Sequence, residues 1–274
     1  MTSPFRIGIV APAGRFSPEA ADRVVKLAAL RQGHPVELVV HPQCFLAQGH
    51  FAGSDQAREE ALVEVANDPT LDAVWFARGG YGSNRVAEAA VERMHTAALK
   101  KPFLGYSDLG FVLAALAKAG ASRAAHGPMC QDVLRPGGEA AVWRALDWLV
   151  DETDAACEPN ALKMPTMAFN LTVLSNLLGT PLEPDFSGRT LMLEDLSEHL
   201  YRIDRSLFHI TSSPNVRRAA GLRLGRISDI PDNDPPFEQT PEQIVRHWSE
   251  VSGVPFLGEA DIGHDLDNKI VPFS

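Results

Sequence analysis

The sequence predicts an α/β fold in which an N-terminal Rossmann-like domain with a parallel sheet precedes a smaller C-terminal α+β domain. Short apolar segments alternate with amphipathic helical patterns over the first 150 residues, as in a βαβ series. Residues 73–77 are continuously apolar, which is typical of a strand buried on both faces. An acidic, proline-containing stretch at 151–165 precedes a second part of different character. We therefore expect domains at 1–150 and 166–274, joined by a linker at 151–165.

The first domain begins with an apolar, β-rich segment at 5–10, which a turn containing proline and glycine ends. Ser17 is a preferred helix cap, and Pro18 and Glu19 suit the first turn of the helix that follows. Ser54 can cap a second helix in the same way. Further strands are predicted at 35–40, 73–77, 102–106 and 122–125, and further helices at 84–94, 109–119 and 139–150.

The second domain is predicted to open with a helix at 170–178, which Gly179 ends. Apolar residues then recur at spacings of three and four from Leu200 to Ile210, the pattern of an amphipathic helix. Thr240 and Gln243 form a capping box for a last helix. Strands are predicted at 190–193, 222–227 and 255–257.

Composition excludes several classes of protein. The net charge of −10 argues against nucleic acid as the main partner. The three cysteines, Cys44, Cys130 and Cys157, are too widely spaced to indicate a disulfide framework or a zinc site, and no metal or other cofactor is expected. Residues 1–6 lack the features of a signal peptide, and no stretch approaches the roughly 20 apolar residues of a membrane span. We expect a soluble cytoplasmic protein without membrane contact.

Ser107 is the first candidate for chemistry, because it lies where the strand at 102–106 turns into the next helix. A serine in a strand-turn-helix segment can be a nucleophile with helix N–H groups nearby. Serine is also a favoured helix cap, and the local pattern leaves both interpretations open. The loops at 11–16, 78–82, 106–108 and 126–131 would lie together at the carboxyl edge of the parallel sheet, where ligands bind.

A nucleophilic serine needs a base, which would be a histidine. Two of the nine histidines, His126 and His264, occupy turns with an adjacent glycine. His126 follows a strand of the first sheet and could line the cleft, or it could be a hydrogen-bonded structural histidine. His264 lies far from Ser107 in sequence, as in a triad assembled across two domains or as in a surface histidine.

The group that orients the base would be an acid at the end of the strand at 190–193. Glu194 and Asp195 are placed there, and Glu198 is the next candidate. The alternative for Glu194 and Asp195 is a helix cap or an ion pair with Arg202 or Arg205.

Six motifs in order make the chain resemble the LD-carboxypeptidases, serine peptidases of the group that includes muramoyltetrapeptide carboxypeptidase and the microcin-immunity hydrolases. The resemblance spans nearly the whole chain. One departure is Ala168-Phe169-Asn170, where the family usually has Gly-Gly-Asn. The motifs lie at 9–14, at 78–82, at 105–108 with 126–128, at 170–171 with 178–181, at 193–195 with 201–205, and at 263–264 with Asn268 and Pro272.

The resemblance implies a Ser-Glu-His triad of Ser107 as nucleophile, Glu194 as orienting acid and His264 as general base and acid. It places this active site between the two domains. It also implies an oxyanion hole from the Asp108 N–H and an N–H of Gly79 or Gly80. The substrate-binding candidates are Arg78, with Arg85 second, for the terminal carboxylate, and Tyr81 and Asn170.

The activity implied by the resemblance is hydrolysis of the L,D-peptide bond that releases terminal D-alanine from murein tetrapeptide, in cytoplasmic peptidoglycan recycling, by a homodimer. Two alternatives stay open. One is hydrolysis of peptidyl- or aminoacyl-nucleotide amides, as in microcin immunity, and the other is a non-catalytic ligand-binding protein. A dinucleotide site is disfavoured because no G-x-G-x-x-G follows the first strand.

Overall fold

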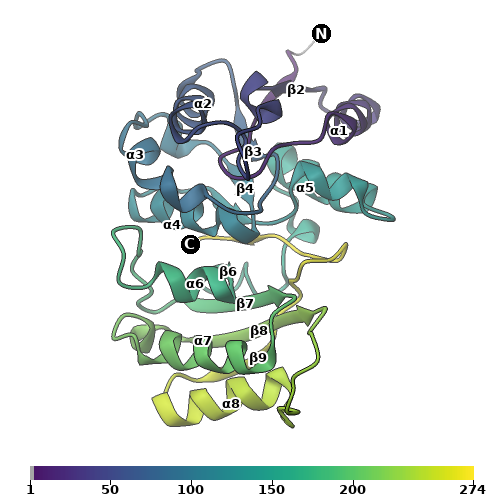
Figure 1. Cartoon of the computed structure of the whole chain (residues 1–274). Helices are drawn as coiled ribbons and strands as arrows, with labels where there is room; N and C mark the ends of the chain where they lie inside the picture. Colours follow the sequence, from purple (N-terminus) through teal and green to yellow (C-terminus); the bar gives the residue numbers. More distant parts are fainter. Residues whose placement is uncertain (1–2) are drawn as a thin grey trace.

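A computed structural model describes residues 3–274 and confirms a two-domain α/β architecture (Figure 1). The first domain contains a six-stranded sheet of order β10-β5-β4-β3-β1-β2, parallel except for β10. The carboxyl ends of β1, β3, β4 and β5 therefore meet at one edge of this sheet, as the sequence predicts.

Helices cover both faces of the first sheet, with α2, α3 and α4 on one face and α1 and α5 on the other (Figure 1). The serine caps predicted for the first two helices are confirmed, since Ser17 and Ser54 accept hydrogen bonds from Ala20 N and Ala57 N. The elements are β1 Phe5–Val10, α1 Pro18–Leu30, β2 Val36–Val40, α2 Asp55–Asn67, β3 Ala73–Phe76, α3 Ala87–Glu92, β4 Phe103–Gly105, α4 Gly110–Lys118, β5 Ala124–His126 and α5 Glu139–Asp151.

The second domain contains a four-stranded sheet of order β6-β7-β8-β9 in which every pairing is parallel. This domain is therefore closer to an α/β arrangement than to the α+β one predicted. Its helices pack on one face of the sheet (Figure 1). The elements are β6 Thr166–Asn170, α6 Leu171–Leu177, β7 Thr190–Leu196, α7 Leu200–Ser212, β8 Gly221–Ser228, α8 Pro241–Ser252 and β9 Phe256–Glu259.

The last strand, β10 (Val271–Pro272), crosses back to the first domain, which the sequence analysis missed. Val271 pairs with His126 of β5, and the tail runs between the two domains to its end beside α4 and α6 (Figure 1). Two residues are too few to produce a strand pattern, and Pro272 suits an edge position because it has no N–H to donate. The segment predicted to belong wholly to the second domain thus contributes to both sheets.

The two domains share one hydrophobic core around α4, α6 and the tail. A Cβ added to Gly110 of α4 would lie 2.9 Å from Val173 of α6, so the helices approach closely there. Phe169 of β6 packs on Phe273 with ring centroids 5.2 Å apart. The arrangement of the domains is therefore set by packed side chains. Over the described residues, the structure contains no helix of the length and apolarity needed to cross a bilayer.

We expect Phe169→Ala to lower the free energy of unfolding by about 3–5 kcal/mol, because it empties a fully buried site where the domains meet. Urea unfolding followed by circular dichroism would measure the change. Phe208→Ala is the control, since that ring is 51% exposed and its loss should cost about 0.5 kcal/mol. Equal losses in the two variants would contradict the shared core.

Candidate active site

Ser107 begins a 3₁₀ turn, Ser107–Leu109, between β4 and α4. Its φ of 60° lies in the left-handed region, which costs a serine roughly 1–3 kcal/mol and is typical of functional turns such as nucleophile elbows. The side chain caps neither the 3₁₀ turn nor α4. The helix-cap interpretation of this serine is therefore wrong for this structure.

The glycine-rich loop at 78–82 lies directly against Ser107. A Cβ on Gly79 would come within 3.1 Å of the Ser107 Cβ and 3.3 Å of its Oγ, so a larger residue would press on the hydroxyl. Gly80 has a φ of 105°, which favours glycine. The Gly79 carbonyl accepts a hydrogen bond from Gly14 N at 3.0 Å, which ties this loop to the turn after β1.

Asp108 ties the glycine loop to the serine turn. Its carboxylate accepts a hydrogen bond from Ser83 N at 2.8 Å, while the Ser83 hydroxyl donates to the Asp108 carbonyl at 2.6 Å. Burial raises the pKa of Asp108, and the hydrogen bonds from Ser83 act against that rise. The Asp108 side chain is thus structural, and its backbone N–H is the group that lies beside Ser107.

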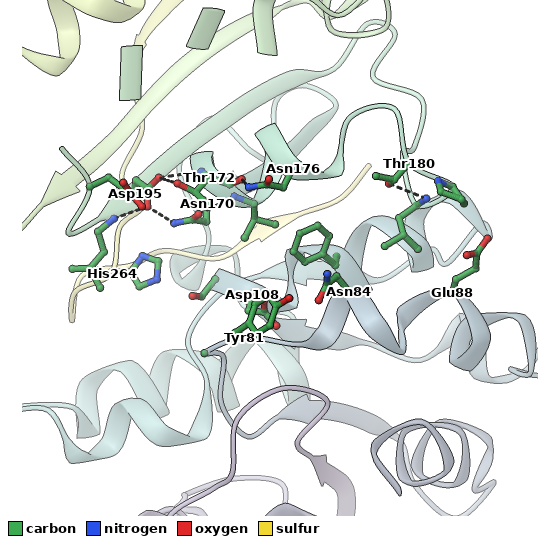
Figure 2. Close-up of a pocket in the computed structure, with 18 residues that line it drawn as sticks. Tyr81, Asn84, Glu88, Asp108, Asn170, Thr172, Asn176, Thr180, Asp195 and His264 are labelled. Carbon is green, nitrogen blue, oxygen red and sulfur yellow. Dashed lines mark hydrogen bonds between the residues drawn. The ribbon is translucent and has the colours of Figure 1, made fainter. Parts of the chain in front are cut away.

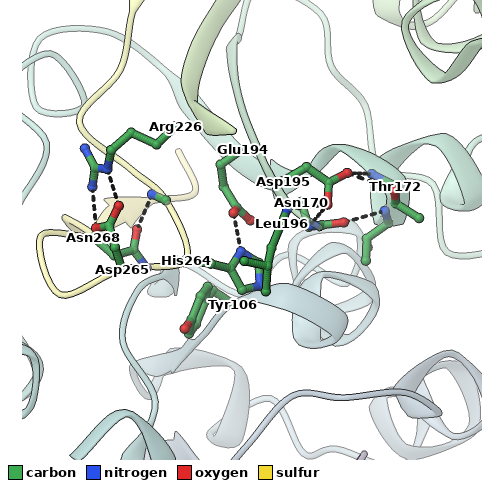
Figure 3. Close-up of polar contacts among 12 residues, drawn as sticks. Tyr106, Asn170, Thr172, Glu194, Asp195, Leu196, Arg226, His264, Asp265 and Asn268 are labelled. Carbon is green, nitrogen blue, oxygen red and sulfur yellow. Dashed lines mark hydrogen bonds and ion pairs between the residues drawn. The ribbon is translucent and has the colours of Figure 1, made fainter. Parts of the chain in front are cut away.

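His264 lies on the loop after β9, and its Nδ1 is hydrogen-bonded to Oε2 of Glu194 in β7 (Figure 3). The Glu194 side chain is fully buried, and the His264 side chain is 7% exposed. Because a carboxylate accepts, this bond assigns the ring proton to Nδ1 and leaves Nε2 as an acceptor. Burial lowers the pKa of His264, but the charge and hydrogen bond of Glu194 outweigh it, so the pKa stands above its usual value.

Glu194 and Asp195 lie inside β7 and not at its tip as predicted. Consecutive strand residues point to opposite sides, and these two acids do so (Figure 3). Asp195 accepts hydrogen bonds from Asn170 Nδ2 at 2.7 Å and from the Thr172 hydroxyl at 2.8 Å. Asn170 in turn caps α6, since its Oδ1 accepts from Val173 N at 3.0 Å.

Glu198 does not contact His264, because it forms an ion pair with Arg202 at 2.8 Å. The alternative considered for Glu194, an ion pair with Arg202, is not observed, because Glu194 contacts His264 and Arg202 pairs with Glu198. Arg205, the other predicted partner, lies over the Tyr201 ring.

A cleft of about 660 Å³, here called the large chamber, opens between the domains. One wall carries Tyr81, Asn84 and Glu88 of the first domain, and the facing wall carries Asn170 and Asp195 of the second (Figure 2). A neighbouring cavity of about 510 Å³, the small chamber, shares part of this lining. The residues common to both chambers are Gly80, Ser107, Leu196 and His264.

Ser107 and His264 thus lie at the junction of two chambers. The structure places no hydrogen bond between the Ser107 hydroxyl and His264, and such bonds often tighten only with a substrate in place. Within residues 3–274, no group of three or more His, Cys, Asp or Glu side chains is arranged to hold a metal ion.

The two arginine candidates differ in their surroundings. Arg78 is exposed and lines the small chamber, where its guanidinium contacts the Arg15 carbonyl at 3.4 Å and no carboxylate of the described residues. Arg85 is paired with Asp55 at 2.7 Å and lies over the Phe51 ring. Its role as second candidate for a substrate carboxylate is therefore not supported.

His126 does not line either chamber. It is 1% exposed in β5, and burial lowers its pKa to about 3. This burial away from both chambers supports a structural position, although His126 Nε2 has no hydrogen-bond partner among the described residues.

The sequence analysis missed several residues that hold the loops of the site in place through hydrogen bonds. Arg58 is fully buried and donates to the Gly82 carbonyl at 2.8 Å, which supports the glycine loop from α2. Asp132 and Arg135 contact Tyr106, the residue before Ser107. Their position next to the predicted edge loop at 126–131 was the signal that could have identified them.

Comparison with known proteins identifies the family. The profile of the LD-carboxypeptidase N-terminal domain matches residues 7–127, and that of the LD-carboxypeptidase C-terminal domain matches residues 165–274. A relative from Synechocystis sp. is 30% identical over 97% of this chain and 88% of its own length. A murein tetrapeptide carboxypeptidase from Pseudomonas aeruginosa is 26% identical, covering 98% of this chain and 91% of the relative.

Solved structures share the fold. Muramoyltetrapeptide carboxypeptidase from Oxalobacter formigenes superposes with a TM-score of 0.80 at 24% identity, over 97% of this chain and 93% of the other. The microcin C7 self-immunity protein MccF superposes with a TM-score of 0.79 at 15% identity, over 100% and 92%. At these identities the likeness concerns the fold alone.

The two-domain fold with a serine turn at the edge of a parallel sheet thus defines a class of serine hydrolases. The chain belongs to the LD-carboxypeptidase family and is a serine-type carboxypeptidase.

Because Glu194 raises the pKa of His264, we expect Glu194→Gln to lower it. The substitution removes the negative charge but leaves the ring buried, and burial alone favours the neutral imidazole. An NMR titration of the His264 ring resonances would measure the shift toward lower pH. Glu198→Gln is the matched control and should leave the titration nearly unchanged. A His264 pKa that does not fall in Glu194→Gln would contradict the pairing.

Proposed function

We propose that this protein hydrolyses the L,D-peptide bond of a murein tetrapeptide and releases terminal D-alanine, with Ser107, His264 and Glu194 as a triad. The observation that carries the proposal is the buried His264–Glu194 pair at the junction of two chambers that Ser107 also lines. The names of relatives similar over nearly their whole length support the choice of substrate.

In the proposed acylation step, His264 Nε2 takes the proton of the Ser107 hydroxyl as Oγ attacks the scissile carbonyl carbon. Glu194 stabilises the imidazolium that forms and holds the ring in orientation. The C–N bond then breaks, and the imidazolium gives its proton to the departing amine of D-alanine. Water, deprotonated by the same histidine, then attacks the acyl carbon, the ester bond to Ser107 Oγ breaks, and the imidazolium returns its proton to Oγ, which releases the shortened peptide and restores the enzyme.

The oxyanion of each tetrahedral intermediate needs N–H donors beside Ser107. The Asp108 N–H belongs to the same 3₁₀ turn, Gly79 approaches the hydroxyl from the facing loop, and Gly80 lines the same chamber. Donors fixed in this way need no reorganisation during the reaction, and losing one typically costs about 10²–10³-fold in rate. We assign the oxyanion hole to the Asp108 N–H and an N–H of this glycine pair.

In this proposal, the two chambers bind opposite ends of the substrate peptide. The leaving D-alanine carries a free carboxylate, and the small chamber contains the exposed Arg78 guanidinium. The acyl part of the peptide then occupies the large chamber, where Tyr81 and Asn170 lie.

The charge of the large chamber favours a peptide over a nucleotide amide. Its lining includes Glu88 and Glu198 and, among the residues that the structure describes, no lysine or arginine. A phosphate-bearing substrate is usually bound by cationic side chains or by free helix N-termini. Assays with an aminoacyl-nucleotide amide beside the tetrapeptide test this preference, and hydrolysis of the amide alone would overturn it.

Ser107→Ala and His264→Ala should each lower kcat for D-alanine release by on the order of 10⁴-fold or more, because each removes a member of the triad. Chromatographic measurement of free D-alanine would follow the reaction. Ser122→Ala and His95→Ala are matched exposed controls that should retain full activity.

A serine-directed phosphonate should label the wild-type protein and fail to label Ser107→Ala. Full D-alanine release by Ser107→Ala or His264→Ala would contradict the assignment of the triad. A wild-type protein that binds the peptide but neither cleaves it nor reacts with the phosphonate would favour a non-catalytic binding protein.

Arg78→Gln should lower kcat/KM for the tetrapeptide by about 10- to 100-fold, the loss of one charge-assisted hydrogen bond of about 1.5–3 kcal/mol. A peptide amidated at its C-terminus should react equally slowly with wild-type and Arg78→Gln enzyme, because it lacks the carboxylate. Arg85→Gln is the matched control, since Arg85 is paired with Asp55. An effect of Arg78→Gln that is equally large on the amide would show another role for Arg78.

A further inference from the structure

We infer that Arg135, with Asp132 and Tyr106, is a positioning group that joins the turn carrying Ser107 to the loop carrying His264 across the domain boundary. The inference rests on the proposed function, because it concerns what holds the proposed nucleophile and base at the separation needed for reaction. These two residues come from different domains, so their separation depends on contacts between the domains and on no single element.

Arg135 contacts both sides of this boundary. It follows the short 3₁₀ helix Cys130–Leu134 of the first domain. Its Nη1 donates a hydrogen bond to the main-chain carbonyl of His264. Its Nη2 donates to the Tyr106 hydroxyl at 3.2 Å. One planar guanidinium therefore links the backbone of the proposed base to the residue that precedes the proposed nucleophile.

Tyr106 contacts the proposed base directly. It is 2% exposed, and its ring lies against the His264 imidazole with centroids 4.8 Å apart and a tilt of 52° (Figure 3). The Tyr106 hydroxyl donates to Asp132 Oδ1 at 2.9 Å. The ring thus limits how far the imidazole can move, while the hydroxyl is held by two partners.

Asp132 completes the group. Its Oδ2 accepts from Met129 N at 2.8 Å, and its Oδ1 lies 3.3 Å from Arg135 Nε. The residue is 8% exposed, so its carboxylate needs the charge of Arg135 and these hydrogen bonds. The carboxylate thus adds an ionic contact to the guanidinium, beside its hydrogen bonds to the His264 carbonyl and the Tyr106 hydroxyl.

Other arginines hold the same loop without making this link. Arg226 of the second domain binds Asp261 and Asp265. Arg144 of α5 donates to the carbonyls of Leu266 at 2.7 Å and Asn268 at 3.2 Å. Neither contacts Tyr106. Arg144 is therefore a matched control, since it is also a first-domain arginine bound to main-chain oxygens of the His264 loop.

Arg135 also belongs to the charges that surround His264. Glu194 of β7 is hydrogen-bonded to the imidazole, and the charges of Asp195, Asp132 and His126 also act on it, while the neighbouring Asp265 is paired with Arg226. The positive charge of Arg135 lowers the pKa of His264, against the larger opposite effect of Glu194. Replacing Arg135 by a neutral residue should raise this pKa and move the acid limb of kcat/KM to higher pH.

The test compares Arg135→Met, Arg135→Lys and Arg144→Met by steady-state D-alanine release and by the rate of reaction with a serine-directed phosphonate. Arg135→Met should lower kcat and the phosphonate rate by on the order of 10²-fold, because a misplacement of about 1 Å at reacting groups costs that much. Its acid limb should move to higher pH. Arg135→Lys keeps the charge but not the planar fork, so its rates should be intermediate and its acid limb unmoved. Arg144→Met should keep wild-type rates and pH profile.

The phosphonate separates positioning from substrate binding, because it carries no terminal carboxylate. A rise in KM for the tetrapeptide with an unchanged phosphonate rate would assign Arg135 to carboxylate binding and overturn the inference. Equal rate losses in Arg135→Met and Arg144→Met would also overturn it, since they would reflect general support of the loop.

Tyr106→Phe provides a second variant if Arg135→Met does not fold. It keeps the ring against His264 and removes the hydroxyl that Asp132 and Arg135 hold. A lower kcat and phosphonate rate with unchanged KM would support the inference, and wild-type rates would overturn it. If the wild-type protein neither releases D-alanine nor reacts with the phosphonate, the proposed function itself is contradicted.

Discussion

The hydrogen bond between the buried Glu194 carboxylate and the His264 imidazole is the interaction on which the site depends. A carboxylate without solvent is costly unless a charged or hydrogen-bonding partner satisfies it, and His264 is that partner. The pair joins β7 to the loop after β9, so it also fixes the last part of the chain against the second sheet. That loop then leads to β10, which adds to the first sheet. One polar contact is therefore coupled to the packing of both domains.

The first domain supplies a rigid, partly strained partner for this pair. Ser107 adopts a left-handed φ, and the glycine loop packs so closely that a side chain at Gly79 would press on Ser107. The buried Asp108 side chain and Ser83 lock the two loops together. These contacts have a common effect: they fix the backbone of the serine turn and its nearby N–H groups before any substrate enters, which is what electrostatic stabilisation of a transition state requires.

Much of the fold could be predicted because it follows local rules. Ser17, Ser54 and Thr240 cap helices where the sequence indicates, and the alternating pattern of the first half corresponds to a parallel sheet. The prediction was wrong for elements without a local pattern, such as the two-residue β10. The sequence also could not show which of Arg78 and Arg85 is available to bind a substrate carboxylate. Arg85 forms an ion pair with Asp55, which lies 30 residues earlier in the sequence.

The sequence by itself determined the family, most of the helices and strands and the short list of candidate residues, because motifs, caps and hydrophobic periods depend on residues close together in the chain. Only the tertiary structure decided which acid meets His264. Glu194 and Glu198 are four positions apart and chemically alike, but one is fully buried against the imidazole while the other pairs with Arg202 at the cleft. It also decided that Arg135 connects the two domains. Such contacts depend on how sheets, loops and tail pack together, which local sequence does not encode.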